Sequence, residues 1–389
     1  MSQRGSVRKR GLTWTAYWFV PDSTGARRQR TKGGFGTKRE AQAYLTEVLG
    51  SIANATYTPP TKLTLGAYLT EHWLPTVRST TRPSTWDSYR RYVDQHIVPE
   101  LGGVLLQQLS AQHLDRYYAG KLAGGRLDGS KGLSVKTVRN IHALMHKALR
   151  DAERKQLVSR NVAANADPPK QTHRSFDKTQ TWSAEQVKTF LIAMSSHRLY
   201  AAYLLAVTTG MRRGEILGLR WQDLDFDSRK LAVRQTVVSV AYEIQLSAPK
   251  TAKGRRSIPL DAGTLTELAA HRRAQDRERK LVGIGYEDND LVFAREDGRP
   301  IHPDLFSQIF DRTVAKLDVP RIRFHDLRHT HATLGLAAGV SPKVMSGRLG
   351  HATVAFTQDV YVHAMPEREQ EAADIVAALF RESDPTGTD

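Results

Sequence analysis

The stretch FHDLRHTH, residues 324–331, places three histidines and an arginine at the start of an apolar helix. His325 and Arg328 are three positions apart, so their side chains share one face of that helix. A metal site formed by His325, His329 and His331 is an alternative interpretation. It is disfavoured because Arg328 would repel a cation and because no carboxylate completes an H-E-x-x-H signature.

The segment TTGMRRGE, residues 208–215, lies upstream between two hydrophobic helical segments. Glu215 follows Arg212 by about one helical turn, so its carboxylate can hold the guanidinium and leave it aimed into a cleft. Arginine–glutamate pairs of this kind are common on protein surfaces. The pair therefore indicates a functional site only in combination with other motifs.

Two more segments carry candidate reactive groups. The stretch APKTAKGRR, residues 248–256, falls between two strand-like runs and puts Lys250 at a hairpin tip. Downstream, LGH at residues 349–351 ends a helix, and Tyr361 follows ten residues later. Because the chain contains no cysteine and no G-x-S-x-G elbow, Tyr361 is a candidate nucleophile.

These groups suit one kind of chemistry. Attack on a phosphodiester builds negative charge on the phosphate oxygens, which two guanidiniums and imidazole donors can stabilise, while a lysine protonates the leaving 5′ oxygen. The sequence has neither an acidic cluster with two-metal spacing nor a G-x-x-x-x-G-K-[ST] motif. The pattern therefore favours metal-free transfer of a phosphoryl group to tyrosine over metal nucleases and nucleotide-driven motors.

The five motifs resemble those of the tyrosine recombinase (phage integrase) family. They are T-G-x-R-x-x-E at 209–215, P-K-T at 249–251, H-x-L-R-H at 325–329, L-G-H at 349–351, and Tyr361. All five occur in the family's order and with similar separations, which makes the resemblance specific.

The resemblance implies a role for each matching residue. Tyr361 would form a 3′-phosphotyrosyl bond, Arg212 and Arg328 would clamp the scissile phosphate, and Lys250 would be the general acid. His325 and His351 would hydrogen-bond to the phosphate and assist proton transfer, and Glu215 would orient the basic groups. No metal and no cofactor are implied. Resealing by a partner strand's 5′-hydroxyl needs no ATP, and two such exchanges in a homotetramer give recombination through a Holliday junction.

The length of 389 residues predicts two or three domains. We expect a mainly α multidomain protein with small β parts: an arm-type DNA-binding domain at 1–58 with a three-stranded sheet and a helix, an all-α (SAM-like) core-binding domain at 62–165, a linker at 166–181, a mixed α+β catalytic domain at 182–380 and an acidic tail at 381–389. The arm-type domain resembles that of integrases of phages and integrative elements.

Patterning and capping signals predict the individual elements. In the first fifty residues, strands are expected at Thr13–Val20 and Ala26–Lys32 before a helix capped by Thr37. The all-α domain should contain helices at about 64–76, 83–98, 110–123 and 134–158. The last domain should begin with helices from 183 and 199, followed by strands at 230–240, 243–247 and 255–260 and then further helices.

The charge of the chain indicates a nucleic-acid partner. Lys and Arg number 57 against 40 Asp and Glu, which gives a formal net charge of +17. We expect double-stranded DNA to bind at core and arm attachment sites through Arg8, Lys9, Arg10, Arg27, Arg28, Arg30, Arg82, Arg90, Lys136 and Arg139. The family resemblance adds a DNA-bending accessory protein and an excision factor as further partners. With no long apolar run and no signal peptide, we expect a cytoplasmic protein without membrane contact.

Two other functions remain open at this point. A type IB topoisomerase shares the tyrosine chemistry but relaxes supercoils as a monomer without choosing a site. A DNA-binding regulator with a decayed catalytic set would carry the same basic charge. The arm-like domain and the P-K-T hairpin favour the recombinase over the first, and Tyr361 favours it over the second.

Overall fold

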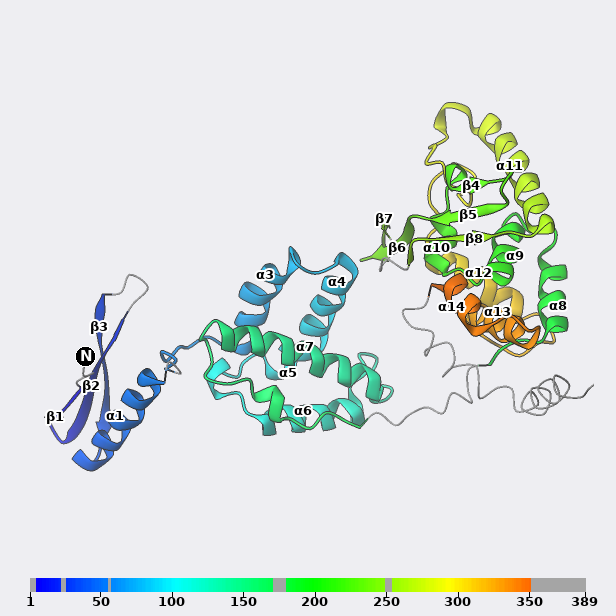
Figure 1. Cartoon of the computed structure of the whole chain (residues 1–389). Coiled ribbons are helices and arrows are strands. Elements are labelled where there is room, and N and C mark those ends of the chain that lie inside the picture. The colour runs from blue at the N-terminus through cyan, green and yellow to red at the C-terminus, as the bar shows by residue number, and fades with distance from the viewer. Residues whose placement is uncertain (1–4, 22–25, 55–56, 171–179, 249–253, 351–389) are drawn as a thin grey trace, which may run out of the picture. The chain divides into compact units, whose positions relative to one another are not determined.

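The computed structural model describes residues 5–21, 26–54, 57–170, 180–248 and 254–350. The chain divides into two compact units, residues 1–172 and 173–389. The first unit contains a sheet-and-helix module and a helical domain, and the second unit contains helices and two small sheets (Figure 1). No helix in the described ranges is long and apolar enough to span a membrane.

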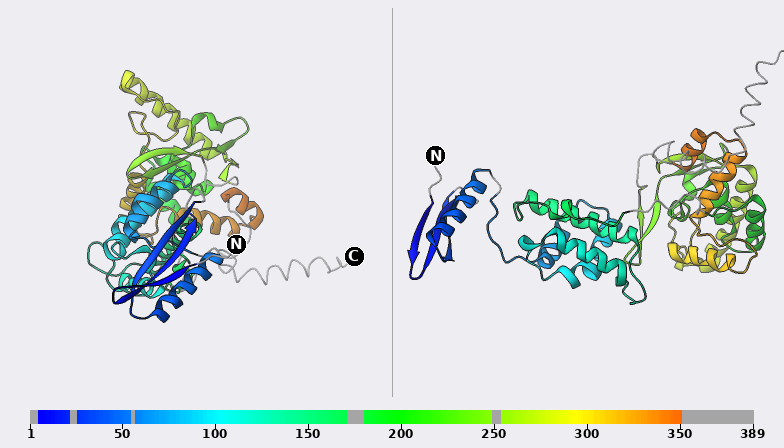
Figure 2. Two further views of the ribbon diagram at one scale, coloured as in Figure 1. Left: turned by 90° about the vertical axis from the view of Figure 1, so that its left-hand side faces the viewer. Right: turned by 90° about the horizontal axis from the view of Figure 1, so that it is seen from below.

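The N-terminal module is a three-stranded antiparallel sheet with one helix on it. Strands β1 (Ser6–Arg10), β2 (Thr13–Pro21) and β3 (Arg27–Phe35) follow one another in the sheet. Helix α1 (Lys38–Ala53) lies along one face, as both views of Figure 2 show. Ala16 and Trp18 of β2 form a core with Leu45 and Val48 of α1, which confirms the expected sheet-plus-helix module.

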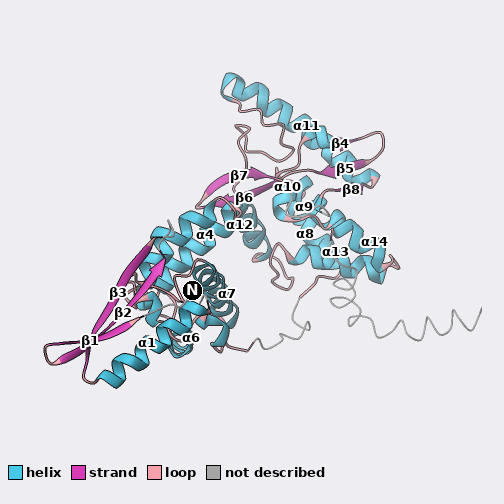
Figure 3. Ribbon diagram, turned by 60° about the vertical axis from the view of Figure 1, so that its left-hand side comes forward, coloured by secondary structure: helices cyan, strands magenta, loops and turns pink. Residues whose placement is uncertain are grey.

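The helical domain follows the four predicted segments. The first is a run of α2 (Leu65–Ala67), π-helical η1 (Tyr68–Trp73) and α3 (Leu74–Arg78), and the second joins α4 (Pro83–Tyr92), π-helical η2 (Val93–Ile97) and α5 (Val98–Leu101). Helices α6 (Ala111–Gly124) and α7 (Val135–Arg154) complete the domain (Figure 3). Short 3-10 turns, η3 (Leu106–Gln108) and η4 (Val162–Asn165), lie between and after them.

Helix α7 ends four residues before the predicted position 158. Gln156 adopts a left-handed backbone with φ of +56°, and the amide of Leu157 donates back to the carbonyl of Ala152. This closing turn satisfies a free carbonyl at the helix end. The sequence lacks the glycine that usually marks such a turn, so the helical pattern alone extended the prediction too far.

The second unit is built around an aromatic core. Helices α8 (Ala184–Met194) and α9 (Tyr200–Thr209) pack with α12 (Pro303–Val314) and α13 (Asp326–Ala337). The rings of Tyr203 and Phe306 stack with centroids 4.5 Å apart, and the Tyr203 hydroxyl donates to the Phe306 carbonyl. The remaining helices are α10 (Arg213–Leu217), α11 (Ala262–Val282) and α14 (Pro342–Leu349), with 3-10 turns η6 (Trp221–Asp223) and η8 (Gly283–Gly285).

The expected continuous strand at 230–240 is wrong. The chain forms β5 (Lys230–Val233), which pairs with β4 (Leu224–Asp225) and β8 (Arg256–Pro259), and then a separate hairpin of β6 (Thr236–Val240) and β7 (Glu243–Ser247). Strand β6 leaves the sheet to lie against α10, where a Cβ on Gly218 would come within 2.9 Å of the Thr236 backbone. The pattern of apolar residues at 230–240 does not change where the strand breaks, so the sequence alone did not indicate this close contact.

We predict that Phe310→Ala destabilises the second unit by about 3–5 kcal/mol, because a large buried ring leaves a cavity. Phe310 lies within 6.4 Å of the rings of Trp182, Phe190, Tyr203 and Phe324. Hydrogen exchange of the α9 and α12 amides in the full chain measures the loss. Leu305→Ala on the same helix is the control, since Leu305 is 44% exposed whereas Phe310 is fully buried. Equal losses in both variants would contradict the assigned core.

Candidate active site

A buried carboxylate forms the centre of the site. Glu215 on α10 is 4% exposed and accepts hydrogen bonds from Arg212 Nη1 at 2.8 Å and from Arg256 Nη1 and Nη2 at 3.1 and 2.9 Å. The ion pair expected from the spacing of Arg212 and Glu215 is therefore present. Burial alone would raise the pKa of Glu215, but the hydrogen bonds and charges of Arg256 and Arg212 outweigh it and lower the pKa below its ordinary value.

Arg212 is the N-cap residue of α10, and its side chain remains accessible. Its backbone N–H donates to Glu215 Oε2 at 3.0 Å, so the residue is held by the same carboxylate at both its main chain and its guanidinium. The side chain is 42% exposed, and Nη2 lies 3.4 Å from the carbonyl of Gly350. A guanidinium held in this way keeps N–H groups available for an anion.

Arg328 is buried and joins two loops. It donates from Nη1 to the carbonyl of Gly210 at 2.8 Å and from Nη2 to the carbonyl of Leu349 at 2.6 Å. Gly210 lies two residues before Arg212. Leu349 immediately precedes Gly350, whose carbonyl is also a partner of Arg212. The two arginines thus brace the same pair of chain segments, although they come from different helices.

The histidines of the 324–331 stretch lie in two environments. His325 caps α13 with an exposed surface, and its ring centroid lies 5.4 Å from that of His329. Loss of water around the ring, followed by the charges of His329 and Arg328, lowers the pKa of His325. His331 instead is turned inward, where Nδ1 bonds to the carbonyl of Val207 at 2.8 Å. His331 therefore has an environment different from that of His325 and His329, whose rings are neighbours.

Gly210 makes the close packing of these loops possible. It ends α9 in the left-handed region with φ of +63°. A Cβ at this position would come within 2.6 Å of Leu349 Cδ2 and 2.8 Å of His331 Cδ2. Only glycine meets both requirements, backbone and space, at the point where Arg328 needs a carbonyl acceptor.

The sequence interpretation missed Arg256. Its side chain is 7% exposed and, in addition to Glu215, bonds to the carbonyl of Arg348 at 2.8 Å. A signal was available, because Arg256, Ile258 and Leu260 alternate along one strand and the latter two are buried. An arginine on the inward side of a strand requires a partner, which the pattern could have indicated.

The remaining predicted catalytic residues, Lys250, His351 and Tyr361, lie outside the described residues, as does the expected acidic tail at 381–389. The flanking residues Gly254 and Gly350 are described, and both contact the site. Arg256 Nη1 donates to the Gly254 carbonyl at 3.3 Å, and Arg212 reaches Gly350. Gly254, which follows residues 249–253, and Gly350, which precedes residue 351, therefore both contact arginines that bind Glu215.

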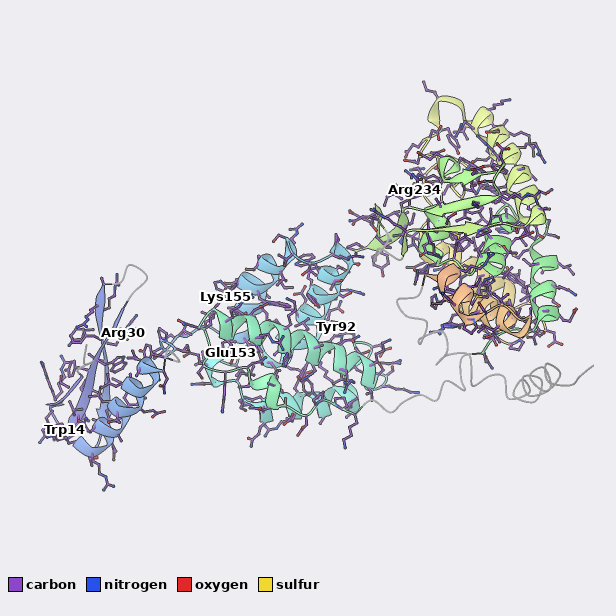
Figure 4. All side chains as sticks on the ribbon, viewed as in Figure 1. Trp14, Arg30, Tyr92, Glu153, Lys155 and Arg234 are labelled. Carbon is purple, nitrogen blue, oxygen red and sulfur yellow. The ribbon has the colours of Figure 1, made fainter. Side chains whose placement is uncertain are left out.

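The register of the N-terminal sheet divides its basic residues between two faces. Val7, Ala16 and Trp18 face α1. Residues paired across neighbouring strands share a face and successive residues of a strand alternate between faces, so these three assign a face to the remaining residues of the sheet. Arg8, Arg10 and Arg27 belong to the open face, and the Arg8 guanidinium lies over the Tyr17 ring at 5.2 Å. The register assigns Lys9, Arg28 and Arg30 to the helix side; Arg30 pairs with Trp18, and Figure 4 labels it on the sheet.

The basic residues of the helical domain differ in their internal contacts. Arg90 bonds to buried Asp87 at 3.0 Å and lies 3.6 Å from Asp94. Arg139 donates to the carbonyl of Pro169 at 3.0 Å. Lys136, in the first turn of α7, and Arg82, the N-cap residue of α4, are exposed.

Comparison with protein families matches three parts of the chain. Residues 6–52 match an arm DNA-binding domain, residues 66–122 match the N-terminal SAM-like domain of phage integrases, and residues 180–368 match the phage integrase family. The chain belongs to the tyrosine recombinase (phage integrase) family. It is a site-specific DNA recombinase that breaks and rejoins DNA strands.

Curated relatives of this recombinase match over most of their length. A tyrosine recombinase XerC-like protein of Caldanaerobacter subterraneus is 28% identical over 360 residues, covering 88% of this chain and 90% of the relative. The integrase of Streptomyces ambofaciens is 25% identical, with 98% and 99% covered, and that of Mycobacterium phage L5 is 26% identical, with 90% and 91% covered.

Solved structures share the fold of the recombinase. The Tn1549 transposon integrase, solved with transposon right end DNA, superimposes with a TM-score of 0.64 at 19% identity and covers 81% of this chain and 99% of its own. A lambda integrase dimer bound to a core site gives a TM-score of 0.54 at 17% identity, with 93% and 95% covered. The mainly α fold with small sheets is therefore confirmed.

We predict that Gly210→Ala destabilises the second unit by about 2–4 kcal/mol, from the left-handed backbone and the overlap with Leu349 and His331. Hydrogen exchange of the α9 and α13 amides gives the change. Gly120→Ala is the matched control: Gly120 lies inside α6 with open space at its Cβ, so alanine should stabilise that helix by up to about 1 kcal/mol. A neutral Gly210→Ala would show that the two loops are not closely packed.

Proposed function

We propose that the recombinase cleaves DNA through Tyr361, with Arg212 and Arg328 as the phosphate clamp, Lys250 as general acid and His325 and His351 as hydrogen-bonding partners of the phosphate. The observation that supports this most directly is the shared bracing of two loops. Arg328 bonds to Gly210 and Leu349, and Arg212 bonds to Gly350. The two guanidiniums are thereby fixed in one region before DNA binds, as a clamp requires.

The proposed reaction conserves a phosphodiester at every step. Tyr361 Oη attacks phosphorus and passes its proton to a neutral histidine of the site, the bond to the 5′ oxygen breaks, and Lys250 gives its proton to that oxygen. Burial lowers the pKa of His325 and of His329, which favours the neutral imidazole, and a neutral imidazole can donate one hydrogen bond without adding a charge. Attack by a 5′-hydroxyl on the phosphotyrosyl bond reverses the step without ATP and without a metal ion.

The assembly that follows from this reaction is a homotetramer on two DNA sites. Each strand exchange needs two active tyrosines, and two exchanges resolve a Holliday junction. One solved relative is a lambda integrase tetramer bound to a Holliday junction. We further propose that residues 1–58 bind arm sites, that residues 62–165 and 182–380 bind the core site, and that a DNA-bending protein and an excision factor select the direction.

We predict that Tyr361→Phe abolishes covalent DNA adducts while DNA affinity stays the same, because only the nucleophile is lost. Full-length wild type and variant are incubated in EDTA with sheared genomic DNA from a strain that carries the gene, denatured in SDS, and the attached DNA is sequenced. Wild-type adducts at one discrete site are expected, and they also identify the core site.

The same experiment separates the alternatives. Adducts scattered over the genome would indicate a topoisomerase. Tight binding without any wild-type adduct would indicate a regulator, a strict need for a divalent ion would contradict the metal-free mechanism, and adducts on the phenylalanine variant would refute the assignment of the nucleophile.

For the arm domain, we propose that the open face of the sheet reads base edges and that the helix side contacts phosphates. The open face presents Arg8, Arg10 and Tyr17, with Phe19 and Gln29 opposite one another further along. An arginine over an aromatic ring is held in a defined direction, which suits bidentate recognition of a base. A two-stranded or wider ribbon fits the major groove.

We predict that Arg8→Ala/Arg10→Ala lowers the enrichment of discrete arm sites by about tenfold or more, since each base contact contributes about 1–3 kcal/mol of discrimination. The matched control is Lys9→Ala/Arg30→Ala, which removes two charges from the other face. Each double variant removes two positive charges, so both should reduce the salt dependence of DNA binding by the same amount. Selection of bound fragments from the genomic pool, in the Tyr361→Phe background, gives the enrichment; equal loss in both pairs would refute the division of faces.

A further inference from the structure

Arg256 uses nearly all of its hydrogen-bonding capacity inside the protein. Nη1 and Nη2 grip the two oxygens of Glu215, Nη1 also contacts the Gly254 carbonyl, and Nε donates to the Arg348 carbonyl at 2.8 Å. With 7% of its side chain exposed, it is poorly placed to contact DNA. Its contribution to the recombinase must therefore act through the groups that it holds.

Those groups belong to three separate motif segments. Glu215 holds Arg212, Gly254 follows the segment that carries Lys250, and Arg348 lies two residues before Gly350 and three before His351. We infer that Arg256 is a positioning residue for DNA cleavage: it holds Glu215 ionised and in place, so that Arg212 is oriented toward the scissile phosphate, and it fixes the end of α14 beside that pair. This inference rests on the proposed function of Arg212.

A second ion pair in the same unit, between Arg220 and Asp223, serves as a comparison. Arg220 grips Asp223 with Nε at 2.7 Å and Nη2 at 3.0 Å, and Asp223 is as buried as Glu215. Arg220 and Asp223, however, are three residues apart in one turn and belong to none of the motif segments. Both carboxylates are buried and held by two nitrogens of one arginine and by a second arginine, Arg234 in the case of Asp223. The pairs differ in exposure, 25% for Arg220 against 7% for Arg256, and in what they connect.

Removing Arg256 changes the electrostatics of Glu215 in a way that can be measured. The charged groups that act on Glu215 among the described residues are Arg256 on β8 and Arg212 at the start of α10. Without Arg256 the carboxylate stays buried with a single guanidinium, so its pKa rises. Protonation then removes the partner of Arg212, and cleavage is lost as the pH falls through the raised pKa.

The test compares full-length wild type with Arg256→Met, Arg256→Lys and Arg220→Met. The probe is the sheared genomic DNA already described, in EDTA, and the readout is the rate of adduct formation divided by the DNA bound before denaturation, measured from pH 5 to 9. We expect Arg256→Met to slow cleavage about 100-fold, as for a misplaced catalytic group, and to add a new acidic limb to the pH profile. Arg256→Lys should remove that limb, because its ammonium keeps a positive charge beside Glu215.

Arg220→Met controls for the loss of a buried ion pair and should leave the pH profile unchanged. A second check is Glu215→Gln/Arg256→Met, in which the acidic limb should be absent since no carboxylate remains to titrate. If wild type forms adducts and Arg256→Met behaves like Arg220→Met, the positioning role is wrong while the proposed function stands. If wild type forms no adducts, both fall.

Discussion

A single carboxylate shared by two guanidiniums organises the catalytic unit. A buried charge without a partner is strongly destabilising, and a buried pair that loses one member leaves the other uncompensated. Glu215 meets this constraint with Arg212 on one side and Arg256 on the other, and its negative charge lets two arginines lie close together in a site that must attract phosphate. The charge that remains is positive, which suits a DNA-binding surface.

The small sheet and its hairpin explain how distant segments reach this carboxylate. Strand β8 brings Arg256 next to β5, and β6 turns away from the sheet to pack on α10, the helix that carries Glu215. Arg328 then closes the arrangement from α13 by bonding to the ends of α9 and α14. The site is consequently a product of the helix ends and one strand end, with the aromatic core of Tyr203, Phe306 and Phe310 behind them.

Much of this could be predicted from the sequence, because the motifs carry their own local structure. The Arg212–Glu215 pair followed from spacing, and two of the helices followed from the cap at Thr37 and the start at Ser183. The break in the strand at 234–235 could not be foreseen, since it depends on close contact between β6 and the glycines of α10. Arg256 was overlooked for a different reason. A basic residue is normally assumed to face solvent, and only the alternation of buried residues along β8 shows that Arg256 lies on the inward face.

Arg328 donates to two main-chain carbonyls, those of Gly210 and Leu349. A main-chain acceptor survives almost any substitution at its own position, whereas a side-chain acceptor is lost with a single codon change. These two hydrogen bonds therefore depend on the position of the backbone at 210 and 349, and the glycine at 210 is required for space and for its left-handed backbone. At these two points, the orientation of a buried cation is set by the path of the chain, so a shift of either helix end would turn the guanidinium as well.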